Sequence, residues 1–114
     1  MNDEGAEMLA NALFNNISIK EINLDDNKIG IKGIKELSEK VFGKISLNRI
    51  NLGHNLIDEE GALHLGNSLK NASNLKYLLL NSNKLMDNGC KYFSDGLKER
   101  KTDLVSSSKQ KSWR

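Results

Sequence analysis

The residues of this 114-residue chain that are best suited to catalysis or metal binding do not stand at the spacings that such chemistry needs. His54 and His64 form no His-Glu-x-x-His motif, and the single cysteine, Cys90, cannot supply the cysteine pairs of a zinc site. The run Asp25-Asp26-Asn27 lacks the alternating spacing and the terminal Glu of a calcium loop. No glycine-rich phosphate loop with its lysine is present. We therefore expect no enzymatic activity, no cofactor and no metal ion.

The distribution of charged and apolar residues argues against nucleic-acid and membrane partners. Residues 98–114 contain six basic and two acidic residues, whereas residues 1–97 contain 11 basic and 13 acidic residues. A mildly acidic body is not typical of a nucleic-acid-binding protein, and no apolar run approaches the roughly 18 residues of a membrane span. One cysteine forms no internal disulfide, which favours a reducing compartment. We expect a cytoplasmic protein that binds neither nucleic acid nor a membrane.

Six sets of residues recur at intervals of 28 residues. The sets consist of glycines, asparagines and aliphatic residues: Gly5, Gly33, Gly61 and Gly89; Asn27, Asn55 and Asn83; Ile19, Leu47 and Leu75; Ile22, Ile50 and Leu78; Leu24, Leu52 and Leu80; Ile29, Ile57 and Leu85. Within each interval the apolar spacing first alternates, as in a strand with one buried face, and becomes helical after the asparagine. One strand followed by one helix, repeated, predicts a parallel sheet with the helices along one side.

The other members of the repeat have predictable structural roles. Because an Asn side chain has both donors and an acceptor, we expect the repeated asparagines to satisfy backbone groups of their own turn and of a neighbouring turn. Asp3 and Asp87 precede a repeated glycine by two residues and are expected to cap helices, whereas Ile31 takes that position in the second unit and cannot. Cys90 falls in a column of apolar residues and is expected to be a packed core thiol.

The stretches 19–29, 47–57 and 75–85 follow the pattern L-x-x-L-x-L-x-x-N-x-I, with Ile and Leu exchanged at several positions. With a glycine and a helix after each stretch, residues 3 to about 98 resemble the ribonuclease-inhibitor-like leucine-rich-repeat family. The resemblance implies an α/β leucine-rich-repeat solenoid, a right-handed β-α superhelix with parallel strands on the concave face and helices on the convex face. Members of the family share a curved surface that binds other proteins. The resemblance therefore implies a protein-interaction module whose protein partner is unidentified.

The C-terminal end departs from the repeat. A fourth strand would need apolar anchors at three positions that hold Asp103, Ser106 and Ser108, so we expect only three strands. We expect a leucine-rich-repeat domain over residues 1–100 and a basic, Ser- and Lys-rich tail over residues 101–114. The tail is either flexible or folds back over the open end through Leu104, Val105 and Trp113.

The N-terminal end also departs from the repeat, because the chain begins on a helix with no strand before it. The first strand, residues 19–24, then has an unprotected edge that can pair with another chain. We expect the chain to be either a fragment of a longer array or a protein that self-associates end to end.

The residues between the strand anchors are expected to line the concave face. Ten of them form the predicted partner-binding site: Lys20, Glu21, Asn23, Asn48, Arg49, Asn51, Lys76, Tyr77, Leu79 and Asn81. Equivalent residues on neighbouring strands lie roughly 4.8 Å apart, so we expect Glu21 to pair with Arg49, and Arg49 to lie on the ring of Tyr77. Tyr and Arg are favoured in binding hot spots, although the same polar lining is compatible with a merely solvated surface.

Two functions stand as alternatives to a general interaction scaffold. One is GTPase activation of the Ran type, although the acidic tail typical of that family is replaced here by a basic one. The other is a structural unit that assembles through its open ends.

Overall fold

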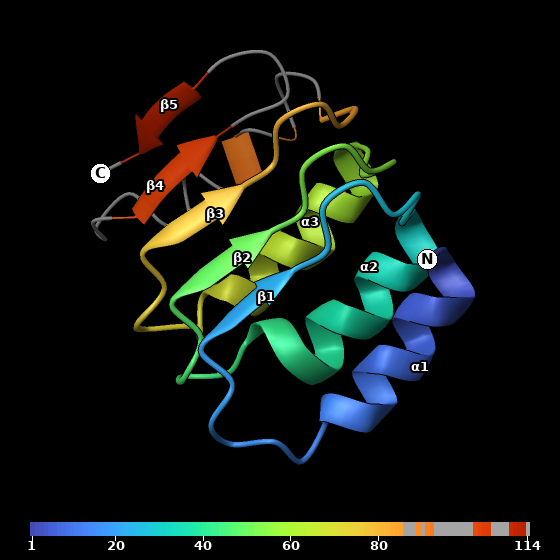
Figure 1. Ribbon diagram of the computed structural model, residues 1–114. Helices are drawn as coiled ribbons and strands as arrows, with labels where there is room; N and C mark the ends of the chain where they lie inside the picture. The colour runs from blue at the N-terminus through green and yellow to red at the C-terminus, as the bar shows by residue number, and fades with distance from the viewer. Residues whose placement is uncertain (86–88, 90, 93–101, 106–109, 114) are drawn as a thin grey trace.

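The computed structural model describes residues 1–85, 89, 91–92, 102–105 and 110–113. The expectations for Asp87 and Cys90 lie outside these residues. The helices are α1 (Asp3–Leu13), α2 (Ile31–Leu37), which continues as the π-helix η1 (Ser38–Phe42), and α3 (Glu59–Leu69); the strands are β1 (Glu21–Asn23), β2 (Arg49–Asn51), β3 (Tyr77–Leu79), β4 (Thr102–Val105) and β5 (Gln110–Trp113). Figure 1 shows two layers, in which the strands form one sheet and the helices cover one of its faces.

The sheet has the order β1-β2-β3-β4-β5. The first three strands are parallel, and their register joins residues that are 28 apart, such as Ile22 with Ile50 and Ile50 with Leu78. The parallel sheet and the register predicted from the repeat are therefore confirmed for these strands.

The expectation of only three strands is wrong. Strand β4 continues the parallel sheet and pairs Leu78 with Leu104, an interval of 26 residues rather than 28. A strict interval places the anchor at Ser106, so the shortening by two residues conceals an apolar anchor that the sequence does contain. Strand β5 then pairs antiparallel with β4. Two segments of the tail that was expected to be flexible are thus strands of the same sheet, whereas the boundary at residue 100 stays a prediction.

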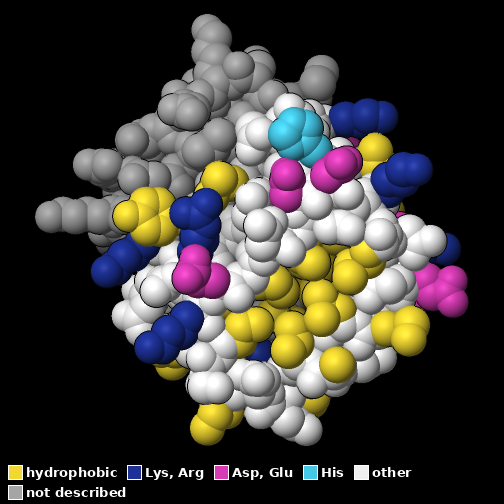
Figure 2. All heavy atoms as spheres, in the orientation of Figure 1, with side chains coloured by type: hydrophobic (Ala, Val, Ile, Leu, Met, Phe, Trp, Pro, Cys, Tyr) yellow, Lys and Arg dark blue, Asp and Glu magenta, His cyan; other side chains and the backbone are white. Residues whose placement is uncertain are grey.

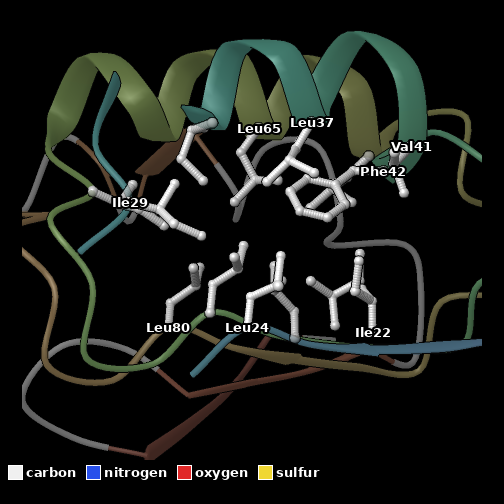
Figure 3. Close-up of a cluster of buried hydrophobic side chains, with 14 of the residues drawn as sticks. Ile22, Leu24, Ile29, Leu37, Val41, Phe42, Leu65 and Leu80 are labelled. Atoms are coloured by element: carbon white, nitrogen blue, oxygen red, sulfur yellow. The ribbon is translucent and has the colours of Figure 1, made fainter. Parts of the chain in front are cut away.

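The core lies between the two layers and is almost entirely aliphatic. Figure 3 shows side chains from the strands, such as Ile22 and Leu24, pointing toward side chains from the helices, such as Leu37 and Leu65. The one large aromatic residue in this core is Phe42, which is fully buried next to the buried Val41 in sequence. Two consecutive buried residues do not fit an α-helical period, and η1 accommodates both because a π-helical turn holds an extra residue.

Two helices are capped one residue earlier than predicted. The side chains of Asn2 and Asp58 each accept a hydrogen bond from the N–H of the third helical residue, at 3.1 and 2.9 Å. Asp3 does not cap its own helix: its Oδ1 accepts from the backbone N–H of Gly30, at 2.6 Å, and so ties α1 to the start of α2. Helix α2 has no side-chain cap, as Ile31 predicts.

The recurring glycine allows the helices to pack closely. A Cβ atom at Gly33 would lie 2.9 Å from the Cβ of Ala6 and 2.8 Å from Cγ2 of Ile29. These distances are shorter than van der Waals contact, so a side chain at this position would push α2 away from α1 or from the turn that precedes it. The glycine is therefore selected by space between successive units.

The repeated asparagines form the predicted bridges between turns. In the buried residue Asn55, Oδ1 accepts from the N–H groups of Asn27 (3.1 Å) and Ile29 (2.9 Å) in the unit before. Its Nδ2 donates across the units to the carbonyl of Leu24 at 2.9 Å and within its own turn to that of Leu52 at 3.0 Å. Asn83 repeats the arrangement one unit later, with bonds to Ile57 N–H and to the carbonyl of Leu52.

A repeated backbone conformation, which sequence analysis missed, precedes each asparagine. Asp26, His54 and Ser82 stand 28 residues apart and have φ angles of 59°, 53° and 59°. These are left-handed conformations that cost energy in residues other than glycine. The position escaped notice because its three residue types share no obvious property.

Replacement of Asn55 should destabilise the fold far more than replacement of Asn27. We expect Asn55→Ala to lower the free energy of unfolding by about 2–4 kcal/mol, because buried backbone groups in two turns lose their partner. Asn27 makes one side-chain bond, to the carbonyl of Asp25, and Asn27→Ala should cost about 0.5–1 kcal/mol. Urea unfolding of both variants measures the difference. Equal losses would show that the bridge between units is not what stabilises the turn.

Candidate functional site

The ten predicted binding residues lie along the face of the sheet that points away from the helices, which we call the outer sheet face. On each strand the middle residue is buried and its neighbours reach the surface. Lys20, Glu21, Asn23, Arg49, Lys76 and Tyr77 are exposed, whereas Asn48, Asn51, Leu79 and Asn81 are half-buried. The register then groups these residues into rows that run across the strands.

The first row joins Glu21, Arg49 and Tyr77 in the way the sequence predicts. Nε of Arg49 lies 4.0 Å from Oε1 of Glu21, and its Cζ lies 5.8 Å from the centroid of the Tyr77 ring. Both distances are at the long end for such contacts. Since the side chains are also well exposed, each contact contributes about 0.5–1 kcal/mol at most. The Arg49 guanidinium is thus oriented but only weakly held, and its remaining N–H groups are available to a ligand.

The second row contains Asn23, Asn51 and Leu79, and its members differ in role. Oδ1 of Asn23 accepts from the N–H of Asp25 at 3.1 Å, and Oδ1 of Asn51 accepts from the N–H of Gly53 at 3.0 Å. These two amides therefore stabilise their own turns, and their carbonyl oxygens are already engaged. Leu79 cannot make this bond, and it places an apolar side chain on the outer sheet face at the strand that also carries Tyr77.

A polar cluster that sequence analysis missed lies next to these rows. Nδ1 of His54 is 3.0 Å from Oδ1 of Asp25, and both side chains are about half exposed. At Gly53, a Cβ atom would lie 2.8 Å from that same Asp25 oxygen and 2.7 Å from Oδ1 of Asn81. The absence of a side chain at Gly53 therefore lets its neighbours in the row converge. The only sequence signal was that 29 residues, one more than the repeat, separate Asp25 from His54.

A second hollow lies on another part of the molecule, at the beginning of α3. It has a volume of about 490 Å³ and is lined by Asp58, Glu59, Glu60, Leu63, Lys84 and Tyr92. It contains none of the ten predicted residues, so it is separate from the outer sheet face. Within the described part of the chain, no three His, Cys, Asp or Glu side chains stand together as metal ligands.

Comparison with known families supports the class of protein that the fold suggests. Residues 15–38, which include β1 and all of α2, match the family model described as Leucine Rich repeat. The chain therefore contains a leucine-rich repeat. No curated protein matches the chain. Among the residues described, no helix combines the length and the apolar character needed to cross a membrane.

Leu79→Asn should leave the fold intact. We expect its free energy of unfolding to stay unchanged or to rise by about 0.5–1 kcal/mol, because the new amide can accept the N–H of Asn81 as Asn23 and Asn51 do for their turns. Urea unfolding is the measurement. A loss of stability would mean that Leu79 contributes to packing and is not free to serve a partner.

Proposed function

We propose that this protein is an interaction module that binds another protein through its outer sheet face. In this proposal the sheet is the concave side of a right-handed leucine-rich-repeat solenoid of the ribonuclease-inhibitor-like kind, and binding requires no cofactor. The presence of a leucine-rich repeat supports a protein partner in general. The absence of disulfide chemistry in a chain with one cysteine supports the cytoplasm as its compartment.

The observation that carries the proposal is the placement of Arg49, Tyr77 and Leu79 on neighbouring strands. Arg and Tyr are the residue types that most often dominate binding energy, and they do so when an apolar surface beside them excludes water. Arg49 is held in an extended position by its contacts on both sides. It therefore loses little side-chain entropy on binding.

The charge of the outer sheet face indicates the chemistry of the partner. Lys20, Arg49 and Lys76 are basic, and Glu21 is the one acidic residue among the ten. A partner surface with a carboxylate beside an apolar side chain would satisfy both Arg49 and Leu79. Such a contact is favoured because a planar guanidinium binds a carboxylate with two parallel hydrogen bonds.

The size of the face requires that the adjoining turns take part. Three strands span about 10–15 Å across the sheet, which is small for an interface that commonly buries about 800 Å² per partner. The polar cluster around Gly53 extends the face from the strands to the turns. We therefore include Asp25 and His54 in the proposed contact region.

Affinity capture from cell extract with matched variants tests this function. Arg49→Ala and Tyr77→Ala should each weaken retention of the specific partner roughly 30-fold, the effect of about 2 kcal/mol at a hot spot. Their controls are Lys35→Ala and Leu63→Ala, which remove an exposed basic residue and a similarly exposed apolar residue from the helical layer. Quantitative mass spectrometry of the captured proteins is the measurement.

The result has two clear outcomes. A protein that is lost with both outer-face variants and kept with both controls supports the proposal. If every captured protein is retained equally by all four variants, or is lost only with the helical-layer variants, the outer sheet face is not the binding surface.

A further inference from the structure

The N-terminal end of the molecule leaves apolar positions uncovered that are buried in the units that follow. Leu9, Leu13 and Ile19 are only partly buried. The residues 28 positions later, Leu37, Val41 and Leu47, are almost completely buried because the first unit covers them. The strand anchors change in the same direction, since Ile22 retains 8% exposure and its equivalents Ile50 and Leu78 retain none.

Exposed apolar residues are concentrated at this same end. Within the described part of the chain, the large hydrophobic residues with the greatest exposure near α1 are Met1, Met8, Phe14 and Ile17, with exposed fractions of 53, 69, 56 and 90%. Figure 2 shows hydrophobic side chains gathered in the space between β1 and α1, with nothing covering them from that side. A contiguous apolar patch of this kind marks an interaction surface.

The backbone edge beside this patch is also unpaired. Between units, the N–H of Leu24 donates to the carbonyl of Asn51, and the N–H of Leu52 donates to that of Leu79. The equivalent acceptor in the first unit is the carbonyl of Asn23, which lies on the free edge of the sheet because β1 is its first strand. The N-terminal end therefore combines an apolar patch with a strand edge that can accept another strand.

We infer that the N-terminal end binds the N-terminal end of a second copy of this chain, related by a two-fold axis. A head-to-tail array in the repeat register would need a parallel strand at the opposite edge of the sheet, but β5 there runs antiparallel to β4. A two-fold arrangement instead pairs β1 with β1 and α1 with α1, so that each apolar patch is buried by an identical one. Closed two-fold contacts are also the commonest form of self-association.

Charge selects one register for this pairing. Antiparallel pairing centred on Ile22 places Glu21 opposite Asn23 of the second copy, whereas pairing centred on Glu21 would place two carboxylates directly opposite one another, which is unfavourable. The same two-fold axis makes the α1 helices antiparallel. When they cross at Met8, Glu4 lies opposite Ala12 of the second copy, so the acidic halves of the two helices do not meet.

The area at this end suffices for a weak to moderate dimer. A molecule with extents of 31 × 26 × 18 Å has principal faces of roughly 500–800 Å², and one partner of a standard interface contributes about 800 Å². The inference uses a surface distinct from the site of the proposed function, so either one can fail without the other.

Sedimentation velocity of the full chain over a hundred-fold range of concentration tests the inference. The wild type should approach twice its mass of 12.8 kDa as concentration rises, and should not exceed it. Met8→Glu and Ile17→Glu should each weaken dimerisation at least roughly ten-fold, because each buries a carboxylate in the apolar contact. Ile45→Glu is the control, since Ile45 is 64% exposed, close to the value for Met8, but precedes β2 rather than lying at the N-terminal end.

The outcomes separate the inference from its alternatives. A strictly monomeric wild type, or growth to species larger than a dimer, overturns it. Equal weakening by Ile45→Glu and Met8→Glu also overturns it, because the contact would then not be specific to the N-terminal end. Circular dichroism of each variant identifies any that fails to fold. Because Ile17 lies in the segment between α1 and β1, Ile17→Glu tests the same contact without altering the helix.

Discussion

The fold depends on amide side chains that satisfy the backbone of two consecutive turns at once. Where each strand ends, a residue in the left-handed region directs the chain toward the helical layer, and the N–H and carbonyl groups there have no strand partner. Asn55 binds such groups on both sides of itself. A buried polar group without a partner costs about 1–3 kcal/mol, so the amide also determines which turn stacks on which. The aliphatic core can close only in the alignment that the amides permit.

The same alignment produces the candidate site. Since every strand is held at the same height as its neighbour, residues 28 apart stand side by side, and a short segment from each unit contributes one residue to each row. Arg49 reaches both Glu21 and Tyr77 for this reason, although the three residues are far apart in sequence. The outer sheet face is therefore a direct consequence of the turn chemistry on the other side of the strand, and a change in the asparagines would displace its rows.

Periodicity made the sheet, its register and the Glu21–Arg49–Tyr77 row predictable, because each depends only on equal spacing. The features that depend on unequal spacing were not predictable. Strand β4 was missed because its interval is two residues shorter, and the burial of Phe42 was missed because η1 holds an extra residue. The pairing of His54 with Asp25 crosses from one column to the next. The cap at Asn2 was missed because Asp3, the neighbouring acid, is equally suited by type and was needed elsewhere.

The two proposed surfaces are connected through β1. If β1 pairs with β1 of a second copy, the two outer sheet faces become one continuous face, and Arg49 of each copy lies one strand from the junction. Three strand spacings, about 14 Å, then separate the two Arg49–Tyr77 rows. A partner that presents two acidic and apolar sites at that distance would bind both copies together, and its second contact would form at a high effective concentration. Dimerisation would in this way compensate for the small area of a single outer sheet face.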